Sequence, residues 1–177
     1  DQMVGPWQTP VADVAVGLRD FDGYAGEALA MGERPPIAVI SPAAASRMAI
    51  GESLTNLYAA PVPRLDRVKL SANWMAACGE PSEDADLYDA VQAASDLCIA
   101  LGVSVPVGKD SLSMRTIWRE PGQGGESPSR SVTSPTSLVI TAFSVIEDAR
   151  QVLTPVLDRR LDSVLILIDL GQGRQRM

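Results

Sequence analysis

The chain has 177 residues and a formal net charge of −7, with 46% hydrophobic and 21% charged residues. This length suits one packed domain better than two, and the composition is typical of globular rather than disordered proteins. The negative charge, with no basic stripe in the sequence, argues against binding to a nucleic-acid backbone. No apolar run reaches the roughly 18 residues needed to cross a bilayer, so a membrane is not an expected partner either.

The supply of reactive side chains is narrow. The chain has no histidine and only two cysteines, Cys78 and Cys98. Ser-His-Asp and Cys-His catalysis are therefore excluded, and so is a zinc site. Because the sequence shows no secretory signal, we expect free thiols and a cytoplasmic location, with Cys98 packed in a helix. The first residue is not Met and the last residues follow a predicted strand, so we expect both ends to continue into a longer protein.

Four elements are predicted before residue 60. Short apolar stretches favour strands, and a Ser-Pro pair followed by an apolar run favours a helix. Ser41 would cap that helix and Pro42 would occupy its first turn, while Gly32 would end a shorter helix before it. In chain order we predict a buried strand, a short helix, a second strand and a long helix, at residues 11–16, 23–31, 36–40 and 43–58.

Six further elements are predicted after residue 60. The clearest is a helix that follows an N-cap at Ser82 and ends at Gly102, because apolar residues recur in it at spacings of three and four. A polar stretch rich in glycine and proline predicts a surface loop. In chain order we predict a strand at 67–73, this helix, a buried strand at 103–107, the surface loop at 119–135, a long strand at 138–146 and a last strand at 163–170.

The order of these elements predicts the fold class. Helices and strands alternate at first and then give way to strands, which is typical of an α+β fold with a mixed β-sheet covered by two main helices. We assign residues 1–147 to this domain. Residues 148–177 are predicted to be an interdomain link followed by the first strand of a second domain.

One group of polar side chains predicts a metal site. Glu52 and Asn56 are four residues apart near the end of the long predicted helix, so they share one helical face. Asp13 lies in the first predicted strand, where a buried carboxylate needs a partner. Together they would form an all-oxygen cluster that suits magnesium and, through it, nucleotide phosphates. The alternatives are a loop hydrogen bond for Asp13 and solvated side chains on the helix.

A second group follows the strand at 103–107. Gly108, Lys109, Asp110 and Ser111 come directly after it, where the ligand-binding loops of α/β sheets tend to lie. A lysine, a carboxylate and a hydroxyl could hold a phosphate or a second metal ion. The alternative is an ordinary turn with a solvated lysine.

Six motifs, in this order, resemble those of phosphoribosylformylglycinamidine synthase of the large, single-chain bacterial type. They read DQMVGPWQ at 1–8, VAD at 11–13, GESLTN at 51–56, LSANWM at 70–75, PVGKDSLSM at 106–114 and TSPTSLVITAF at 133–143. The resemblance runs from the first residue to about Gly173.

The resemblance implies a fold, an activity and a set of ligands. Enzymes of this family are ligases of de novo purine biosynthesis, which use ATP and ammonia from glutamine to convert formylglycinamide ribonucleotide into formylglycinamidine ribonucleotide. Their core is a pseudo-dimer of two halves similar to aminoimidazole ribonucleotide synthetase. This chain resembles the N-terminal domain of the second half, which holds an auxiliary adenine nucleotide, ATP or ADP, through magnesium. Asp13, Glu52 and Asn56 match the family's magnesium ligands, and Ala12 matches a backbone contact to the nucleotide.

The resemblance also implies what the chain does not do alone. The family's substrate-processing half carries a Glu-Thr-His-Asn-His-Pro motif that is absent from this sequence, so we expect the fragment to be inactive. The implied partners are the first synthetase-like half and the glutaminase domain of the same synthase. One alternative is a non-catalytic structural half with no bound nucleotide. Another is a different enzyme of the aminoimidazole ribonucleotide synthetase superfamily, such as a selenophosphate synthetase or a thiamine monophosphate kinase.

Overall fold

The computed structural model describes residues 3–4, 8–120, 128–157, 160, 162–169 and 171–174. Its centre is a five-stranded sheet with the strand order β3-β4-β9-β5-β6. All neighbouring strands are antiparallel except β5 and β6, which are parallel. The strands are β3 Val14–Leu18, β4 Gly26–Glu33, β9 Ser137–Ile146, β5 Lys69–Met75 and β6 Ser104–Ser111.

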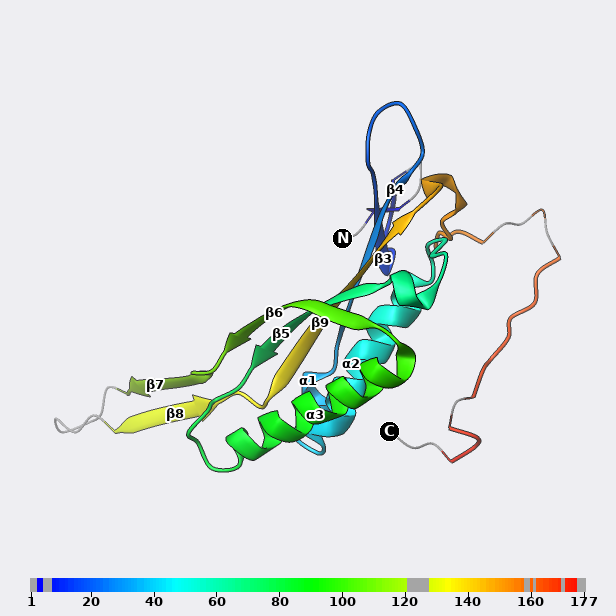
Figure 1. Ribbon diagram of the computed structural model, residues 1–177. Helices are drawn as coiled ribbons and strands as arrows, with labels where there is room; N and C mark the ends of the chain where they lie inside the picture. The colour runs from blue at the N-terminus through cyan, green and yellow to red at the C-terminus, as the bar shows by residue number, and fades with distance from the viewer. Residues whose placement is uncertain are drawn as a thin grey trace.

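Two helices, α2 (Pro42–Leu57) and α3 (Glu83–Leu101), lie against each other on one face of this sheet (Figure 1). The predicted fold class, a mixed sheet covered by two main helices, is therefore confirmed. The Ser41 hydroxyl accepts a hydrogen bond from the Ala44 amide at 3.2 Å, which confirms the predicted N-cap. Gly102 ends α3 in the left-handed conformation, as predicted. Ser82 does precede α3, but its side chain makes no capping hydrogen bond.

The predicted helix at 23–31 is wrong, because this stretch forms β4. Along β4 buried and exposed residues alternate, and the buried positions are glycine or alanine. Alanine, glutamate, leucine and methionine favour helices, but here β3 and β9 flank the strand and take up its backbone hydrogen bonds. Tertiary pairing therefore overrides the local helix preference.

The predicted strand at 36–40 is also wrong. Residues 35–38 form the short helix α1 (Pro35–Ala38), and Val39 and Ile40 follow it in a turn. Proline at the start of a helix costs nothing, whereas in a strand it removes a ladder donor. The two apolar residues are exposed rather than paired.

The predicted strand at 11–16 is only partly confirmed, because β3 begins at Val14. β3 is an edge strand of the sheet, and Val11 and Asp13 are exposed rather than buried. Val11 has a φ of 62°, which is unusual for a β-branched residue and interrupts the strand conformation before Ala12.

The region after α3 differs from the prediction in two ways. The predicted buried strand continues to Ser111 as β6, and most of it is exposed because it forms the other edge of the sheet. The predicted loop at 119–135 contains part of a hairpin, in which β7 (Arg115–Arg119) pairs with β8 (Ser129–Thr133) and projects from the end of the sheet (Figure 1). Residues 121–127 of the predicted loop lie outside the described part.

Smaller elements complete the chain. β1 (Met3–Val4) pairs with β2 (Thr9–Pro10). The 3-10 turn η1 (Leu65–Arg67) precedes β5, and the 3-10 turn η3 (Ala149–Gln151) follows β9. The predicted strand at 163–170 is wrong for residues 163–169, which run exposed and away from the sheet and pair with no described strand (Figure 1). Of the described helices, none has the length and apolar character needed to cross a membrane.

The core lies between the helices and the covered face of the sheet. Its largest fully buried side chains include Ile50 and Leu57 from α2, Leu70 from β5 and Ile140 from β9. The opposite face of the sheet has no helix on it in the described part of the chain. Apolar side chains are exposed along its strands: Leu29, Met31, Val107 and Val145.

Candidate functional site

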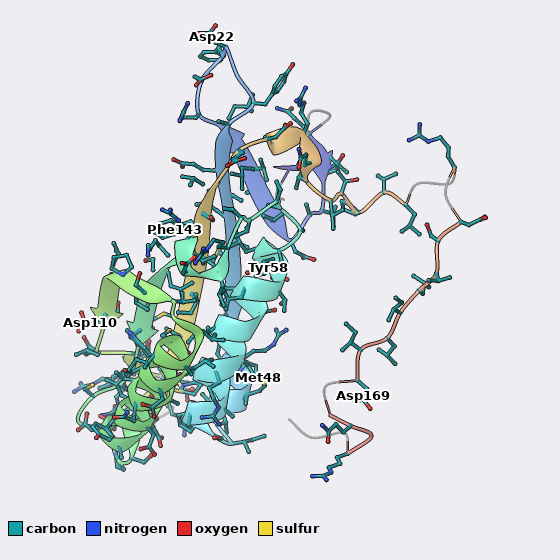
Figure 2. All side chains as sticks on the ribbon, turned by 45° about the vertical axis from the view of Figure 1, so that its right-hand side comes forward. Asp22, Met48, Tyr58, Asp110, Phe143 and Asp169 are labelled. Atoms are coloured by element: carbon teal, nitrogen blue, oxygen red, sulfur yellow. The ribbon has the colours of Figure 1, made fainter. Side chains whose placement is uncertain are left out.

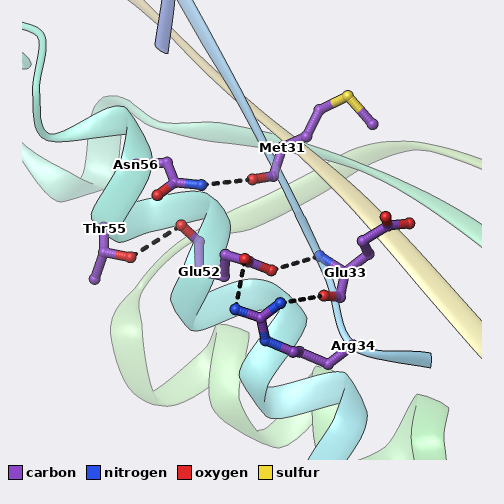
Figure 3. A network of polar contacts seen from close by, with 6 residues as sticks. All are labelled: Met31, Glu33, Arg34, Glu52, Thr55 and Asn56. Atoms are coloured by element: carbon purple, nitrogen blue, oxygen red, sulfur yellow. Dashed lines mark hydrogen bonds and ion pairs between the residues drawn. The ribbon is translucent and has the colours of Figure 1, made fainter. Parts of the chain in front are cut away.

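Glu52 and Asn56, two of the predicted metal ligands, both reach from α2 to the end of β4. Glu52 Oε2 accepts a hydrogen bond from the Glu33 amide at 2.8 Å, and Asn56 Nδ2 donates to the Met31 carbonyl at 3.0 Å (Figure 3). Two side chains four residues apart on α2 therefore contact backbone groups that are two residues apart on β4. The structure brings these two residues together on one strand end.

Asp13 lies near the same strand end. Val14, the first residue of β3, pairs with Ala30, so Asp13 is level with Met31, whose carbonyl Asn56 contacts. Its side chain is exposed and makes no hydrogen bond or ion pair with any described residue. Ala12, the predicted backbone contact to the nucleotide, is half-buried against the core.

Glycine sets the distance between α2 and β4. A Cβ atom added at Gly32 would overlap the Ala49 carbonyl oxygen and would lie only 2.5 Å from the Ser53 nitrogen. Only a residue without a side chain allows the helix backbone to approach the strand this closely. This approach lets Glu52 and Asn56 reach the strand backbone.

A groove of about 610 Å³ runs along α2 beside these two residues. Arg34 Nη2 forms an ion pair with Glu52 Oε1 at 2.7 Å. Arg47, one turn before Gly51 on the same helix, has no hydrogen-bond or ion-pair partner among the described residues. Two guanidinium groups and one carboxylate give the groove a positive excess in a chain of net charge −7. The lining residues are Arg34, Ala44, Arg47, Met48, Gly51, Glu52, Thr55 and Asn56.

The predicted ligands fit magnesium in chemistry but form an incomplete set. Asp13, Glu52 and Asn56 offer only oxygen ligands, which suit this hard cation. Within the described residues, however, no three His, Cys, Asp or Glu side chains lie close enough to hold a metal ion. Glu52 is also already paired with Arg34. A magnesium ion here would need further oxygens, from phosphate, water or ligands outside these residues.

Lys109, Asp110 and Ser111 lie elsewhere. They belong to β6, which β9 and β5 separate from β4, and Figure 2 shows Asp110 and the groove residue Met48 on opposite sides of the domain. Lys109 Nζ donates to Ser111 Oγ at 2.5 Å and to the Asp110 carbonyl at 3.2 Å. These three residues are therefore a strand rather than a loop, and they do not join the Glu52 group.

One neighbour makes this second patch chemically unusual. Asn73, which pairs with Lys109 across β5 and β6, has a buried Oδ1 atom that accepts no hydrogen bond from a described residue. A buried acceptor without a donor costs free energy, so the atom would favour a ligand that donates to it. Asn73 Oδ1 beside the Lys109 ammonium group can bind a ligand that has both a hydrogen-bond donor and a negative charge.

An apolar cavity of about 320 Å³ lies between α3 and the sheet. Trp74, Val105, Ile140 and Cys98 line it, and no charged side chain does. Cys98 is buried, as predicted, and burial raises the pKa of its thiol. Both cysteines are free, which confirms the prediction that they form no disulfide. A cavity without charges has no group for nucleotide phosphates.

The sequence reasoning missed Arg34 and Arg47 as groove residues. A signal for Arg47 was present, because Arg47, Gly51 and Thr55 recur every four residues on the helix that carries Glu52. No comparable signal existed for Arg34. It precedes a segment that was predicted to be a strand, and its ion pair with Glu52 depends on the true path of the chain from β4 to α2.

Comparisons with known proteins agree with this fold. The structure of PurLQS from Thermotoga maritima is 21% identical with a TM-score of 0.59, over 88% of this chain and 23% of that one. T. maritima PurL complexed with ADP is 20% identical with a TM-score of 0.60, over 87% of this chain and 22% of that one. Thiamine monophosphate kinase from Aquifex aeolicus is 12% identical with a TM-score of 0.51, over 78% of this chain and 39% of that one. At these identities the likeness shows a shared fold.

The chain spans less than a quarter of the length of these two T. maritima proteins. The family described as the FGAR-AT PurM_N-like domain matches residues 1–145, most of the chain. The kinase alternative shares the fold, but the family match favours the synthase, so the resemblance drawn from the six motifs is confirmed. The chain belongs to the family of FGAR-AT PurM_N-like domains.

Proposed function

We propose that this chain is a domain of phosphoribosylformylglycinamidine synthase, the ATP- and glutamine-dependent ligase of purine biosynthesis, and that it supplies an auxiliary magnesium-nucleotide site. The observation that carries the proposal is the meeting of Glu52 and Asn56 on the end of β4, beside a groove with two arginines. The T. maritima PurL structures with ADP and with ATP support the choice of an adenine nucleotide. A cytoplasmic location and a glutaminase domain elsewhere in the protein belong to the same proposal.

In this proposal each group at the strand end has one task. Asp13 would present its oxygens to the metal from the chain just before β3, and Glu52 and Asn56 would present theirs from α2. The backbone of β4 orients Glu52 and Asn56. Magnesium, when bound, would neutralise the charge of the nucleotide phosphates. The strained φ of Val11 turns the chain just before Ala12 and Asp13, where a backbone contact to the nucleotide is proposed.

The uncovered sheet face has a second proposed task, as the scaffold of the pseudo-dimer. Leu29, Met31, Val107 and Val145 expose apolar surface on neighbouring strands, and exposed apolar patches mark interaction sites. We propose that this face packs against the first synthetase-like half. The catalytic chemistry would then lie in that half rather than in this domain.

Lys109, Asp110 and Ser111 stay a separate prediction, because they lie across the sheet from the groove. We propose that Lys109 and Ser111, which lie on the same sheet face as Asn73, contact a polar ligand together with the buried Asn73 Oδ1 atom, which accepts no hydrogen bond from a described residue. The Asp110 side chain points to the other face of the sheet and would not share this ligand. Lys109→Met should then weaken ligand binding in the full-length synthase without changing its content of auxiliary nucleotide. A loss of that nucleotide would instead place Lys109 in the same site as Glu52.

The nucleotide proposal is tested by the variants Asp13→Asn and Glu52→Gln in the full-length synthase. The purified protein is denatured and the released adenine nucleotide is measured. We expect both variants to release less nucleotide and to melt at a lower temperature, because a ligand bound only to the folded state stabilises it. Saturation near a thousand times the dissociation constant is worth about 4 kcal/mol, so the shift is measurable.

Asp89→Asn is the matched control, because Asp89 is an exposed carboxylate on α3 that does not line the groove. It should keep the wild-type nucleotide content. Wild-type protein that releases no nucleotide would favour the alternative of an empty structural half. Unchanged content in both site variants would show that these oxygens are not ligands. Loss of turnover with nucleotide content and stability intact would make the site catalytic instead.

A further inference from the structure

We infer that Arg34 is an exchangeable counter-ion for Glu52: its guanidinium group holds the carboxylate while no metal is bound, and turns to the nucleotide phosphates beside Arg47 when the magnesium-nucleotide enters. This inference rests on the proposed function, because it assumes that Glu52 becomes a metal ligand. It adds two arginines and an order of events to that site.

The contacts of Glu52 leave little room for a metal beside Arg34. Oε1 pairs with Arg34 Nη2 at 2.7 Å, and Oε2 accepts the Glu33 amide at 2.8 Å (Figure 3). Arg34 Nη1 also donates to the Glu33 carbonyl at 3.3 Å. The guanidinium group of Arg34 and the backbone amide of Glu33 therefore occupy both oxygens of the carboxylate. A divalent cation on Oε1 would bring two positive charges next to the guanidinium group, so one of the two cations has to leave.

Arg34 is the cation that can leave at low cost. Its side chain is 46% exposed, while that of Glu52 is 24% exposed. Ion pairs with this much solvent contact contribute little net stability. The Glu33 amide remains bonded to Oε2 when Arg34 departs, so the carboxylate keeps its orientation. Release of Arg34 therefore exposes a ligand that is already in position.

The groove offers Arg34 a destination. Arg34 and Arg47 line the same groove, and Arg47 has no partner among the described residues. Two guanidinium groups present paired donors that match phosphate oxygens, and a polyphosphate can accept from both. The incoming ligand thus brings a cation for Glu52 and an anion for Arg34. Each charge of the original ion pair gains a new partner, and no charge is left unpaired.

The test measures metal and nucleotide separately on full-length synthase stripped of nucleotide. Mn²⁺ binding without nucleotide is followed by electron paramagnetic resonance, and Mg²⁺-ADP binding by calorimetry. The Mn²⁺ site that Glu52→Gln removes is the site of interest. We expect Arg34→Gln to raise the Mn²⁺ affinity of that site about tenfold, since the competing cation is gone, and to lower Mg²⁺-ADP affinity about tenfold, the size expected for one charge-assisted hydrogen bond.

Arg47→Gln is the matched control for the sign of these effects. It should lower Mg²⁺-ADP affinity and leave Mn²⁺ affinity unchanged, because Arg47 forms no hydrogen bond or ion pair with Glu52. An Arg34→Gln protein that binds Mn²⁺ no better than wild type, while Glu52→Gln abolishes that binding, would overturn the inference and leave the proposed function standing. Glu52→Gln with unchanged Mn²⁺ and nucleotide binding would overturn the proposed function itself. If circular dichroism shows that Arg34→Gln is unfolded, Arg34→Lys is measured instead, because it keeps the charge but loses the paired donors of the guanidinium group. It must then raise the Mn²⁺ affinity and lower the Mg²⁺-ADP affinity by smaller factors.

Discussion

The contact between α2 and β4 through Gly32 can be tested by adding one methyl group. In Gly32→Ala the new Cβ would lie 2.5 Å from the Ser53 nitrogen, whereas ordinary contacts begin near 3.4 Å. Both atoms that it meets first, the Ala49 carbonyl oxygen and the Ser53 nitrogen, belong to the helix backbone, so no side chain can turn away. The helix therefore has to retreat from the strand by about 1 Å.

The cost follows from two opposing effects. Overpacking a well-packed core typically costs about 1–3 kcal/mol, and a clash with backbone belongs at the upper end of that range. Replacing glycine also restricts the unfolded chain, which returns about 0.4–1 kcal/mol. We therefore expect Gly32→Ala to lower the free energy of unfolding by about 2 kcal/mol. For a chain of this size that corresponds to a fall in Tm of about 4–8 °C.

The same retreat should damage the candidate site. The bonds from Glu52 and Asn56 to β4, at 2.8 and 3.0 Å, would lengthen toward the limit for hydrogen bonds near 3.5 Å. Gly32→Ala should therefore also lower the nucleotide content of the full-length synthase. A substitution elsewhere in the domain that lowers Tm by the same amount should leave the nucleotide content unchanged.

Gly51→Ala is the matched control, because Gly51 lies in α2 and nothing lies within 4 Å of a Cβ atom built there. In a helix interior this change should raise the free energy of unfolding by up to about 1 kcal/mol. Urea unfolding of the 177-residue chain, followed by circular dichroism, measures both variants. Gly32→Ala with wild-type stability would refute the close approach of helix and strand, and with it the account of how Glu52 and Asn56 are positioned.

Three further predictions concern the rest of the chain. The Arg150 guanidinium beside Asp148 lowers the pKa of that carboxyl from 3.8 to about 2, so its stabilising effect is fully present above pH 3.8 and is lost as the pH falls through 2. Asp148→Asn should therefore lower the urea midpoint at pH 6 and lower it much less at pH 2, and an equal loss at both would contradict this. The isolated chain should form no product from ATP, glutamine and formylglycinamide ribonucleotide, since it has no histidine and no glutaminase element, and product above background in a preparation free of host enzyme would disprove this. Because one sheet face exposes apolar side chains that no described helix covers, the isolated chain should associate as its concentration rises, whereas sedimentation as a stable monomer at high concentration would count against the scaffold proposal.

The elements that could be predicted from sequence are those with strong local signals. α2 has a serine cap and a proline in its first turn, α3 has an apolar stripe and a terminal glycine, and β9 is a long apolar run. Their packing agrees with their local preference, so the two sources of information do not conflict. Their existence and type were therefore right, even where the cap at Ser82 was not.

The elements that were missed depend on contacts distant in sequence. β4 is built from helix-favouring residues, and its alternation of small and large side chains has meaning only once α2 lies on one face. β6 was expected to be buried because it is apolar, but it lies at an edge of the sheet, a position that single-sequence patterns do not reveal. Of the last predicted strand, at 163–170, residues 163–169 have apolar character but no partner strand among the described residues.

The candidate site shows how these successes and failures combine. Glu52 and Asn56 could be named from sequence because both lie on a helix whose periodicity is readable. Their actual partners, the backbone groups of Glu33 and Met31, could not, because they lie on the strand that was predicted to be a helix. Arg34 was missed for the same reason, since its position follows from where β4 ends. The spacing of polar residues on α2 thus predicts which side chains act together, while the small residues of β4 determine how close to the strand they can act.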